Sequence, residues 1–227
     1  MILPSREEIQ KIWGHFPVGL NDFISIRALC PKGVEYFLYT QNVTFNAIDF
    51  PDVEERKRAF EDKVMKLNVE GYNVYFVMNL ISPEFRGNLR NTAAVSDTDI
   101  IARRYLLIDI DRDDTTQPAS MEELTEVVGV ARDIQRHLRE EFGYKPIRVF
   151  SGNGCHLYLP LANLPNTEET REHCHSILLR LARKFNTGSV NVDTSVANAS
   201  RITKLPGTVA RKGLESEGRA YQLARVL

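Results

Sequence analysis

The sequence has few cysteines and no long hydrophobic run, and both shortages narrow the class of protein. Three cysteines, Cys30, Cys155 and Cys174, are spread over 227 residues, and none belongs to a Cys-x-x-Cys pair. This spacing argues against a zinc knuckle or a disulfide framework, and it suits a reducing cytosol. No apolar run reaches the roughly 18 residues of a membrane span, and no signal-length run follows a basic start. We expect a cytoplasmic protein with no membrane partner.

The chain also lacks a net charge of either sign. Its formal charge is -1, so no global basic field indicates nucleic acid. The charge is uneven, however, because residues 201–227 contain six basic and two acidic side chains. A short basic stretch on a neutral protein favours a local phosphate site over a long electrostatic groove. A solvated tail would give the same pattern.

Length and composition are those of an ordinary globular protein. Hydrophobic residues make up 43% of the sequence and charged residues 26%. In the first part we predict a helix over 4–16, strands over 23–29, 34–40 and 72–80, and a helix from Asp52 to about residue 70. Residues 82–99 contain Pro, Gly, Asn, Ser and Thr without periodicity and predict a linking loop.

The second part predicts the element order β-α-β-β-α-β. Strands are expected over 105–111, 147–150, 155–159 and 188–193. One helix, capped by Ser120, is expected from 121 to about 142, and another, capped by Asn166 or Thr167, is expected to end near 186. This order is typical of the ferredoxin-like arrangement, which is also the layout of RNA-recognition motifs (RRMs). We therefore expect an α+β fold. An N-terminal αβ module (1–100) would pack on an RRM-like module (101–227).

The strand over 105–111 ends in two carboxylates, Asp109 and Asp111. Alternate side chains of a strand share a face, so these two point the same way, roughly 7 Å apart along the strand. They repel each other unless a cation lies between them, and hard oxygen ligands suit Mg²⁺ or Mn²⁺. The plain alternative is a strand that simply ends in a polar loop.

Two further segments carry candidate site residues. In Ser151-Gly152-Asn153-Gly154-Cys155-His156, glycines allow backbone amides to approach an anion, and Ser151, Asn153 and His156 add hydrogen-bond donors. An ordinary Asn-Gly turn with His156 on the surface would look the same. Asp193 ends the last predicted strand, where a lone Asp is usually a cap or turn former. Three carboxylates from two strands can hold two divalent ions about 3.5 to 4 Å apart, which suits phosphoryl transfer.

Taken together, these segments resemble the archaeo-eukaryotic primase superfamily, in its phage, plasmid and CRISPR-associated primase-polymerase branch. The resemblance is strongest over 103–212. Leu-Leu-Ile-Asp-Ile-Asp at 106–111 looks like the first motif of that family, residues 151–156 like the second, and Val192-Asp193 like the third. Segments at 26–29, 76–80, 193–202 and 205–208 are also similar.

The resemblance implies a role for each matching residue. Asp109, Asp111 and Asp193 would bind two metal ions, Mg²⁺ or Mn²⁺. Ser151 and His156 would contact the triphosphate, His156 as part of the catalytic set, with Asn153 and Gly154 assisting. The cations implied for phosphate are Arg201 and Lys204, followed by Arg211 and Lys212, which could also contact a template backbone. Arg27 and Asn79 are further candidates to reach the site from the N-terminal module.

The implied activity is template-dependent synthesis by a DNA or RNA primase-polymerase, a nucleotidyltransferase. Its partners would be a ribo- or deoxyribonucleoside triphosphate, a single-stranded DNA template and a primer. Many members continue into a helicase, a zinc element or a helical domain, and this sequence stops at Leu227. We expect either an excised catalytic core or a chain that relies on such partners.

Two other classes remain open from the sequence. One is a catalytically silent single-strand-binding module with an RRM-like sheet, although such sheets present aromatic residues, not carboxylates. The other is a two-metal nuclease, because three carboxylates also suit hydrolysis. The sequence leaves the choice between Mg²⁺ and Mn²⁺ and between ribose and deoxyribose undecided.

Overall fold

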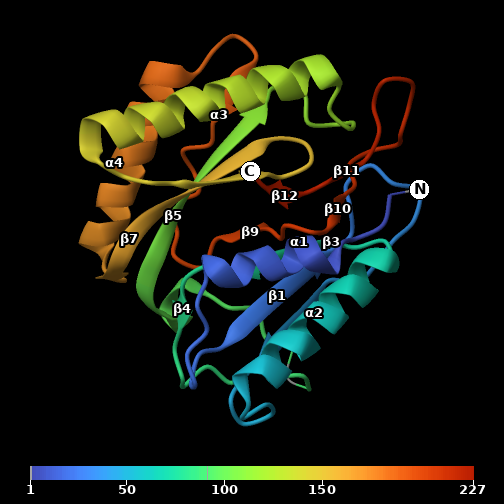
Figure 1. Cartoon of the computed structure of the whole chain (residues 1–227), viewed down its shortest axis with the longest axis vertical. Coiled ribbons are helices and arrows are strands. Elements are labelled where there is room, and N and C mark those ends of the chain that lie inside the picture. Colours follow the sequence, from blue (N-terminus) through green and yellow to red (C-terminus); the bar gives the residue numbers. More distant parts are fainter. Residues whose placement is uncertain (1, 91) are drawn as a thin grey trace.

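A computed structural model describes residues 2–90 and 92–227 and has a mixed α+β architecture. Two antiparallel sheets face each other, with α1 and α2 outside the first sheet and α3 and α4 outside the second (Figure 1). The expected α+β fold is thus confirmed. No helix in the described part of the chain is both long and apolar enough to cross a membrane.

The first sheet has the strand order β2-β1-β3-β9. Its strands are β1 (Ile24–Leu29), β2 (Gln41–Phe45), β3 (Asn73–Val77) and β9 (Ile202–Lys204). Helix α1 (Arg6–Gln10) continues as the 3₁₀ turn η1 (Lys11–Gly14), and α2 (Val53–Val69) begins at its predicted cap Asp52. The Asp52 carboxylate accepts a hydrogen bond from the Glu55 backbone, as an N-cap does.

The predicted strand over 34–40 is wrong, because the strand that pairs with β1 begins at Gln41. Residues 34–40 instead run across the end of α2, where the Tyr36 hydroxyl donates to the Gly71 carbonyl. Phe37 and Tyr39 in this segment are largely exposed. An alternation of apolar residues without a buried face therefore misled the sequence prediction.

The second sheet follows the predicted β-α-β-β-α-β order. Its elements are β5 (Ile100–Arg112), α3 (Met121–Phe142), β6 (Ile147–Phe150), β7 (Cys155–Pro165), α4 (Glu168–Phe185) and β8 (Val190–Val192). The short strands β4 (Leu80–Ile81) and β12 (Arg225–Val226) extend its edges, and η2 (Asp97–Asp99) precedes β5. The sheet order is β12-β6-β7-β5-β4, with β8 also paired to β5, so β5 and β7 are central neighbours, as the ferredoxin-like layout requires.

One face of β5 packs on the helices and the other faces the first sheet. Ile108 and Ile110 are fully buried, in a cluster that includes Val127 and Ile134 of α3 and Leu178 of α4. Side chains alternate along a strand, so Leu107, Asp109 and Asp111 point toward the first sheet. The core thus fixes which face carries the carboxylates, because a one-residue slip of β5 would bury them among the helices.

The C-terminal segment joins the two sheets. After β8 the chain crosses to the first sheet as β9, forms the hairpin β10 (Val209–Ala210) and β11 (Gln222–Leu223), and returns to the second sheet as β12. A module boundary near residue 100 stays a prediction, since each sheet takes strands from both sides of it.

Glu123 anchors this C-terminal segment to the second sheet. Its carboxylate accepts hydrogen bonds from Arg219 Nη1 (2.7 Å), the Ser120 backbone (2.7 Å) and Arg112 Nη1 (3.2 Å). Partial burial opposes ionisation, but the Arg219 and Ser120 hydrogen bonds and the Arg112 charge outweigh it and lower the pKa of Glu123 to about 2. A depressed carboxyl pKa stabilises the fold above the unfolded pKa, and this stabilisation is lost as the pH falls toward the folded value.

We therefore expect Glu123→Gln to lower the free energy of unfolding at pH 7 by about 2 kcal/mol. The deficit should shrink as the pH falls from 4.5 toward 2, because the wild-type carboxylate is then protonated. Urea unfolding across this pH range measures it, with Glu122→Gln, an exposed neighbour in the same helical turn, as the control. A deficit that does not change with pH would contradict this role.

Candidate active site

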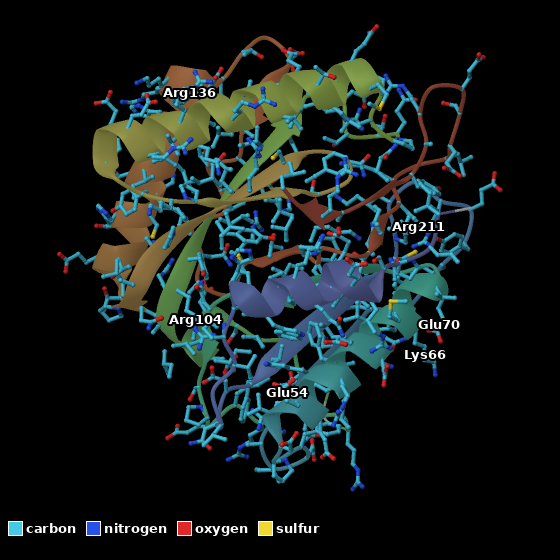
Figure 2. All side chains as sticks on the ribbon, viewed as in Figure 1. Glu54, Lys66, Glu70, Arg104, Arg136 and Arg211 are labelled. Atoms are coloured by element: carbon cyan, nitrogen blue, oxygen red, sulfur yellow. The ribbon has the colours of Figure 1, made fainter. Side chains whose placement is uncertain are left out.

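A polar cavity of about 290 Å³ lies between the two sheets, at the face of β5 and β7 that points away from the helices. Its lining brings together eight of the eleven residues that the sequence predicts for the site: Asp109, Asp111, Ser151, Asn153, His156, Lys204, Arg211 and Lys212. Gly154 lies directly behind the lining, and Asp193 and Arg201 lie beside the cavity. Figure 2 shows Arg211 on the C-terminal segment that borders the first sheet.

The three carboxylates come from two adjacent strands. Asp109 and Asp111 lie on β5, and the Asp193 backbone donates to the Asp109 carbonyl at 2.9 Å, which places Asp193 opposite Asp109. The Asp193 carboxylate accepts from the Ser195 backbone at 2.8 Å and lies 3.5 Å from Arg201 Nη2. Its side chain is 39% exposed, compared with 22% for Asp109. Asp193 is therefore more exposed than Asp109.

The turn over 151–154 packs against Asp111. The Ser151 hydroxyl accepts a hydrogen bond from the Gly154 backbone at 3.0 Å, and the Asn153 side-chain oxygen accepts from the Ala119 backbone at 3.1 Å. A methyl group on Gly154 would lie 2.3 Å from Asp111 Oδ1 and 2.7 Å from the Ile110 carbonyl. Only glycine fits here, so this turn and the second carboxylate are shaped together.

His156 lies at the centre of the cavity floor. Its Nε2 atom is 3.2 Å from Asp109 Oδ1, and its Nδ1 atom is 2.9 Å from the Thr203 hydroxyl, which also contacts the Tyr158 hydroxyl. The Asp109 contact is an ion pair without good hydrogen-bond alignment, because Oδ1 is buried and has no aligned donor in the described chain. Asp109 therefore keeps an unsatisfied oxygen directed at the site.

The electrostatics of the two β5 carboxylates differ. Burial tends to raise the pKa of Asp109, but His156, Arg201 and Lys212 outweigh it and hold that pKa below its ordinary value. Burial, followed by the Asp109 charge, raises the pKa of Asp111 to about 6. Burial tends to lower the pKa of His156, but Asp109 and Asp111 raise it. The site therefore has more negative charge than its nearest cation neutralises.

Four cations line the cavity beside the carboxylates: Lys32, Lys204, Arg211 and Lys212. Burial lowers the pKa of Lys204, Arg211 and Lys212. Lys204 is 4% exposed, and its Nζ donates to Asn73 Oδ1 (3.2 Å) and the Val209 carbonyl (3.1 Å). An anion in the cavity would supply the counter-charge that these groups lack.

The structure adds residues that sequence reasoning missed. Lys32 and Tyr75 line the cavity, and Thr203 positions His156. The sequence predicts the turn that carries Lys32, but not its contact with the C-terminal segment. In that contact the Lys32 carbonyl accepts a hydrogen bond from the Gly213 backbone at 2.7 Å. Among the two weaker candidates, Asn79 is buried and bonds the backbone of Arg104, Tyr105 and Ala199, so it joins β5 to the segment before β9.

The donor set fits a divalent cation at Asp109 and Asp111. The buried, unsatisfied Asp109 oxygen and the raised pKa of Asp111 both indicate carboxylates without sufficient positive charge. In the described chain, however, no three Asp, Glu, His or Cys side chains already converge on one point. A third ligand from Asp193 would have to replace its contact with Arg201.

No protein-family model matches the sequence, and no curated protein matches it either. Solved structures do match. The archaeo-eukaryotic primase (AEP) domain of a primase-polymerase from cyanophage S-2L superposes with a TM-score of 0.58 at 16% identity, over 100% of this chain and 91% of that one. The polymerase domain of Mycobacterium tuberculosis Ligase D, in complex with DNA, gives a TM-score of 0.53 at 15% identity, over 96% and 79%. The chain therefore has the fold of archaeo-eukaryotic primase-type polymerase domains, as the sequence motifs predict.

Proposed function

We propose that this chain is a nucleotidyltransferase, a template-dependent primase-polymerase that joins nucleoside triphosphates to a nucleic-acid 3′ end. The observation that carries the proposal is the pair Asp109 and Asp111 in one cavity with Lys204, Arg211 and Lys212. Carboxylates on one side suit metal ions, and cations on the other side suit a polyphosphate. The likeness to the two polymerase domains supports this assignment.

In this proposal each side of the cavity has one task. Asp109, Asp111 and Asp193 would hold two Mg²⁺ or Mn²⁺ ions, which lower the barrier by stabilising the attacking and leaving oxygens. His156 would turn its Nε2 from Asp109 to a phosphate oxygen, and Ser151 would donate a second hydrogen bond to the triphosphate. Lys204, Arg211 and Lys212 would balance its charge. Thr203 would fix the orientation of His156 through Nδ1.

The ionisation of the cations fits an anionic substrate. Lys204 and Lys212 are both more acidic than an ordinary lysine because burial removes water from the ammonium. A triphosphate would favour their charged forms, so binding it would be accompanied by proton uptake. A site for a neutral ligand would gain nothing from one buried and two half-buried cations.

The two other classes account for less of the structure. A silent RRM-like binding module would present aromatic residues for base stacking. Here the corresponding face of β5 and β7 presents Asp109, Asp111 and His156 to the cavity. A two-metal nuclease would use the carboxylates, but it would not need Lys204, Arg211 and Lys212 opposite them.

The direct test is primer extension on a primed single-stranded template with Mg²⁺ or Mn²⁺. We expect Asp111→Asn to lower incorporation at least about 100-fold, because it removes charge that the transition state needs. Its melting temperature without metal should not fall, because the change also removes repulsion with Asp109. Asp133→Asn, an exposed aspartate of α3, is the control and should extend normally. Full activity of Asp111→Asn, or strand hydrolysis without incorporation, would contradict the proposal.

A second prediction concerns the turn behind Asp111. Gly154→Ala should destabilise the protein by about 1–3 kcal/mol, since the new methyl group overlaps Asp111 and the β5 backbone. It should also lower incorporation by displacing the carboxylate. Gly129→Ala in α3 is the matched control: nothing lies near its added methyl group, so it should gain about 0.5–1 kcal/mol and keep activity. Urea unfolding and primer extension measure both variants, and an unchanged Gly154→Ala would refute the tight fit.

A further inference from the structure

A second polar cavity, of about 180 Å³, lies on the face of the first sheet that also borders the main cavity. Arg27 of β1 and Asn42 of β2 line it from one side, and Asn198, Ser200 and Arg201, which precede β9, line it from the other. Arg27 and Asn42 are cross-strand partners, so both side chains point to the same face. The sequence resemblance implies a phosphate role for Arg201, but the proposed function above assigns no role to Arg201 or Arg27.

The second cavity continues the first one along the strands. Leu29 lines the main cavity and Arg27, two residues earlier on β1, lines the second; Ile202 of β9 lines both. Two residues of a strand span roughly 7 Å, so the cavities are about one nucleotide step apart. Arg201 also connects them, because it lines the second cavity while its Nη2 lies 3.5 Å from Asp193 Oδ2. The second cavity therefore adjoins Asp193 through Arg201.

The chemistry of this cavity fits a phosphate. Arg27 and Arg201 supply two guanidinium groups, and the lining residues include no carboxylate. The Nε atom of Arg27 is buried and has no acceptor in the described chain. A buried donor without a partner destabilises the fold, and an acceptor oxygen would remove that cost.

Asn42 adds a second buried group without a partner, a hydrogen-bond acceptor where Arg27 has a donor. Its side-chain nitrogen donates to the Thr92 carbonyl at 3.1 Å, while its Oδ1 atom is buried and has no donor in the described chain. A nucleotide offers both missing partners, since its phosphate accepts hydrogen bonds and its sugar or base donates them. The Asp97 carboxylate holds the opposite wall by accepting from the Ser200 backbone and hydroxyl, each at 2.7 Å.

We propose that this cavity binds the phosphate on the 5′ side of the nucleotide whose 3′-hydroxyl is extended, with Arg27 and Arg201 as its cations. The inference rests on the proposed function. If the triphosphate occupies the main cavity, the attacking hydroxyl approaches from the side of Asp193. The sugar that bears this hydroxyl then places its own 5′ phosphate beyond Asp193, next to Arg201.

This phosphate has two sources. In a primer it is the last phosphodiester, and in an initiating nucleotide it belongs to the 5′-triphosphate. Both present the same oxygens to Arg27 and Arg201. A site of this kind would hold a first nucleotide that has no duplex to position it.

The test is a chemical double-mutant cycle on the last primer linkage. Primers carry either a normal phosphodiester or an uncharged methylphosphonate at that linkage, and wild type is compared with Arg27→Gln. For wild type we expect the methylphosphonate to raise the primer KM about 10-fold or more, the size of one charge-assisted hydrogen bond. Arg27→Gln should bind both primers equally weakly and keep its KM for the triphosphate.

Three controls define the result. Arg132→Ala, on an exposed position of α3, should behave as wild type. A methylphosphonate two linkages further upstream should not distinguish wild type from Arg27→Gln. Arg27→Lys should recover part of the primer affinity, because it restores charge without the planar fork. If Arg27→Gln loses as much as wild type from the last-linkage methylphosphonate, or changes only the triphosphate KM, the inference is wrong.

Dinucleotide synthesis on an unprimed template separates the two sources. The first nucleotide carries either a 5′-triphosphate or a 5′-hydroxyl. If Arg27→Gln lowers synthesis only from the 5′-triphosphate form, the cavity serves initiation as well as extension. If the defect is confined to primer extension, the phosphodiester alone is its ligand.

A binding measurement separates this inference from the proposed function. Anisotropy of the same labelled primers without divalent cation needs no catalysis. If wild type fails to extend any primer but binds the phosphodiester primer more tightly than the methylphosphonate one, and Arg27→Gln does not, the proposed function fails and the phosphate site stands. Equal binding of both primers by wild type would overturn the site itself.

Discussion

The arrangement of charged side chains around the cavity depends on the repulsion between Asp109 and Asp111. These two carboxylates lie on one face of a central strand. Burial raises the free energy of their charged forms, and each charge disfavours the other. His156 beside Asp109 and the cations that line the cavity partly compensate these negative charges. The ion pair with His156 still leaves Asp109 Oδ1 without an aligned hydrogen-bond donor in the described chain. A fold selected only for stability would place apolar residues on this face, so the charge arrangement indicates a ligand that completes it.

The two sheets are joined so that both kinds of charge reach one cavity. The carboxylates lie on β5 in the second sheet, whereas Lys204 lies on β9 in the first (Figure 1). Asn79 strengthens this connection, because its buried side chain bonds the backbone of β5 on one side and of Ala199 on the other. Relative motion of the sheets would therefore change the distance between the proposed metal ligands and the proposed phosphate ligands directly.

Sequence patterns predicted the elements whose signals are local. The spacing of Asp109 and Asp111 on a strand fixes their shared face, and the caps Asp52, Ser120 and Thr167 mark helix starts by hydrogen bonds within one turn. The glycines of the 151–154 turn are visible for the same reason. The order of the elements predicted the RRM-like layout, and the motifs resembled those of the archaeo-eukaryotic primases. The likeness to two solved polymerase domains confirms the fold.

The remaining features depend on contacts distant in sequence. Three-residue strand β9 has no periodicity of its own, so nothing local indicates that it joins the first sheet and buries Lys204. The docking of Lys32 against Gly213, and the position of Arg27 opposite Arg201, follow from that pairing. The strand predicted over 34–40 was wrong because a local pattern was present without a long-range partner: its apolar alternation has no sheet face to pack against.

The most direct test of the central claim is a crystal structure with Mn²⁺ and a non-hydrolysable deoxynucleoside triphosphate, with manganese located by its anomalous scattering. The account predicts manganese bound by the Asp109 and Asp111 carboxylates, with the phosphates directed toward His156 and Lys212. Manganese absent from these carboxylates while the triphosphate binds elsewhere on the chain would contradict it.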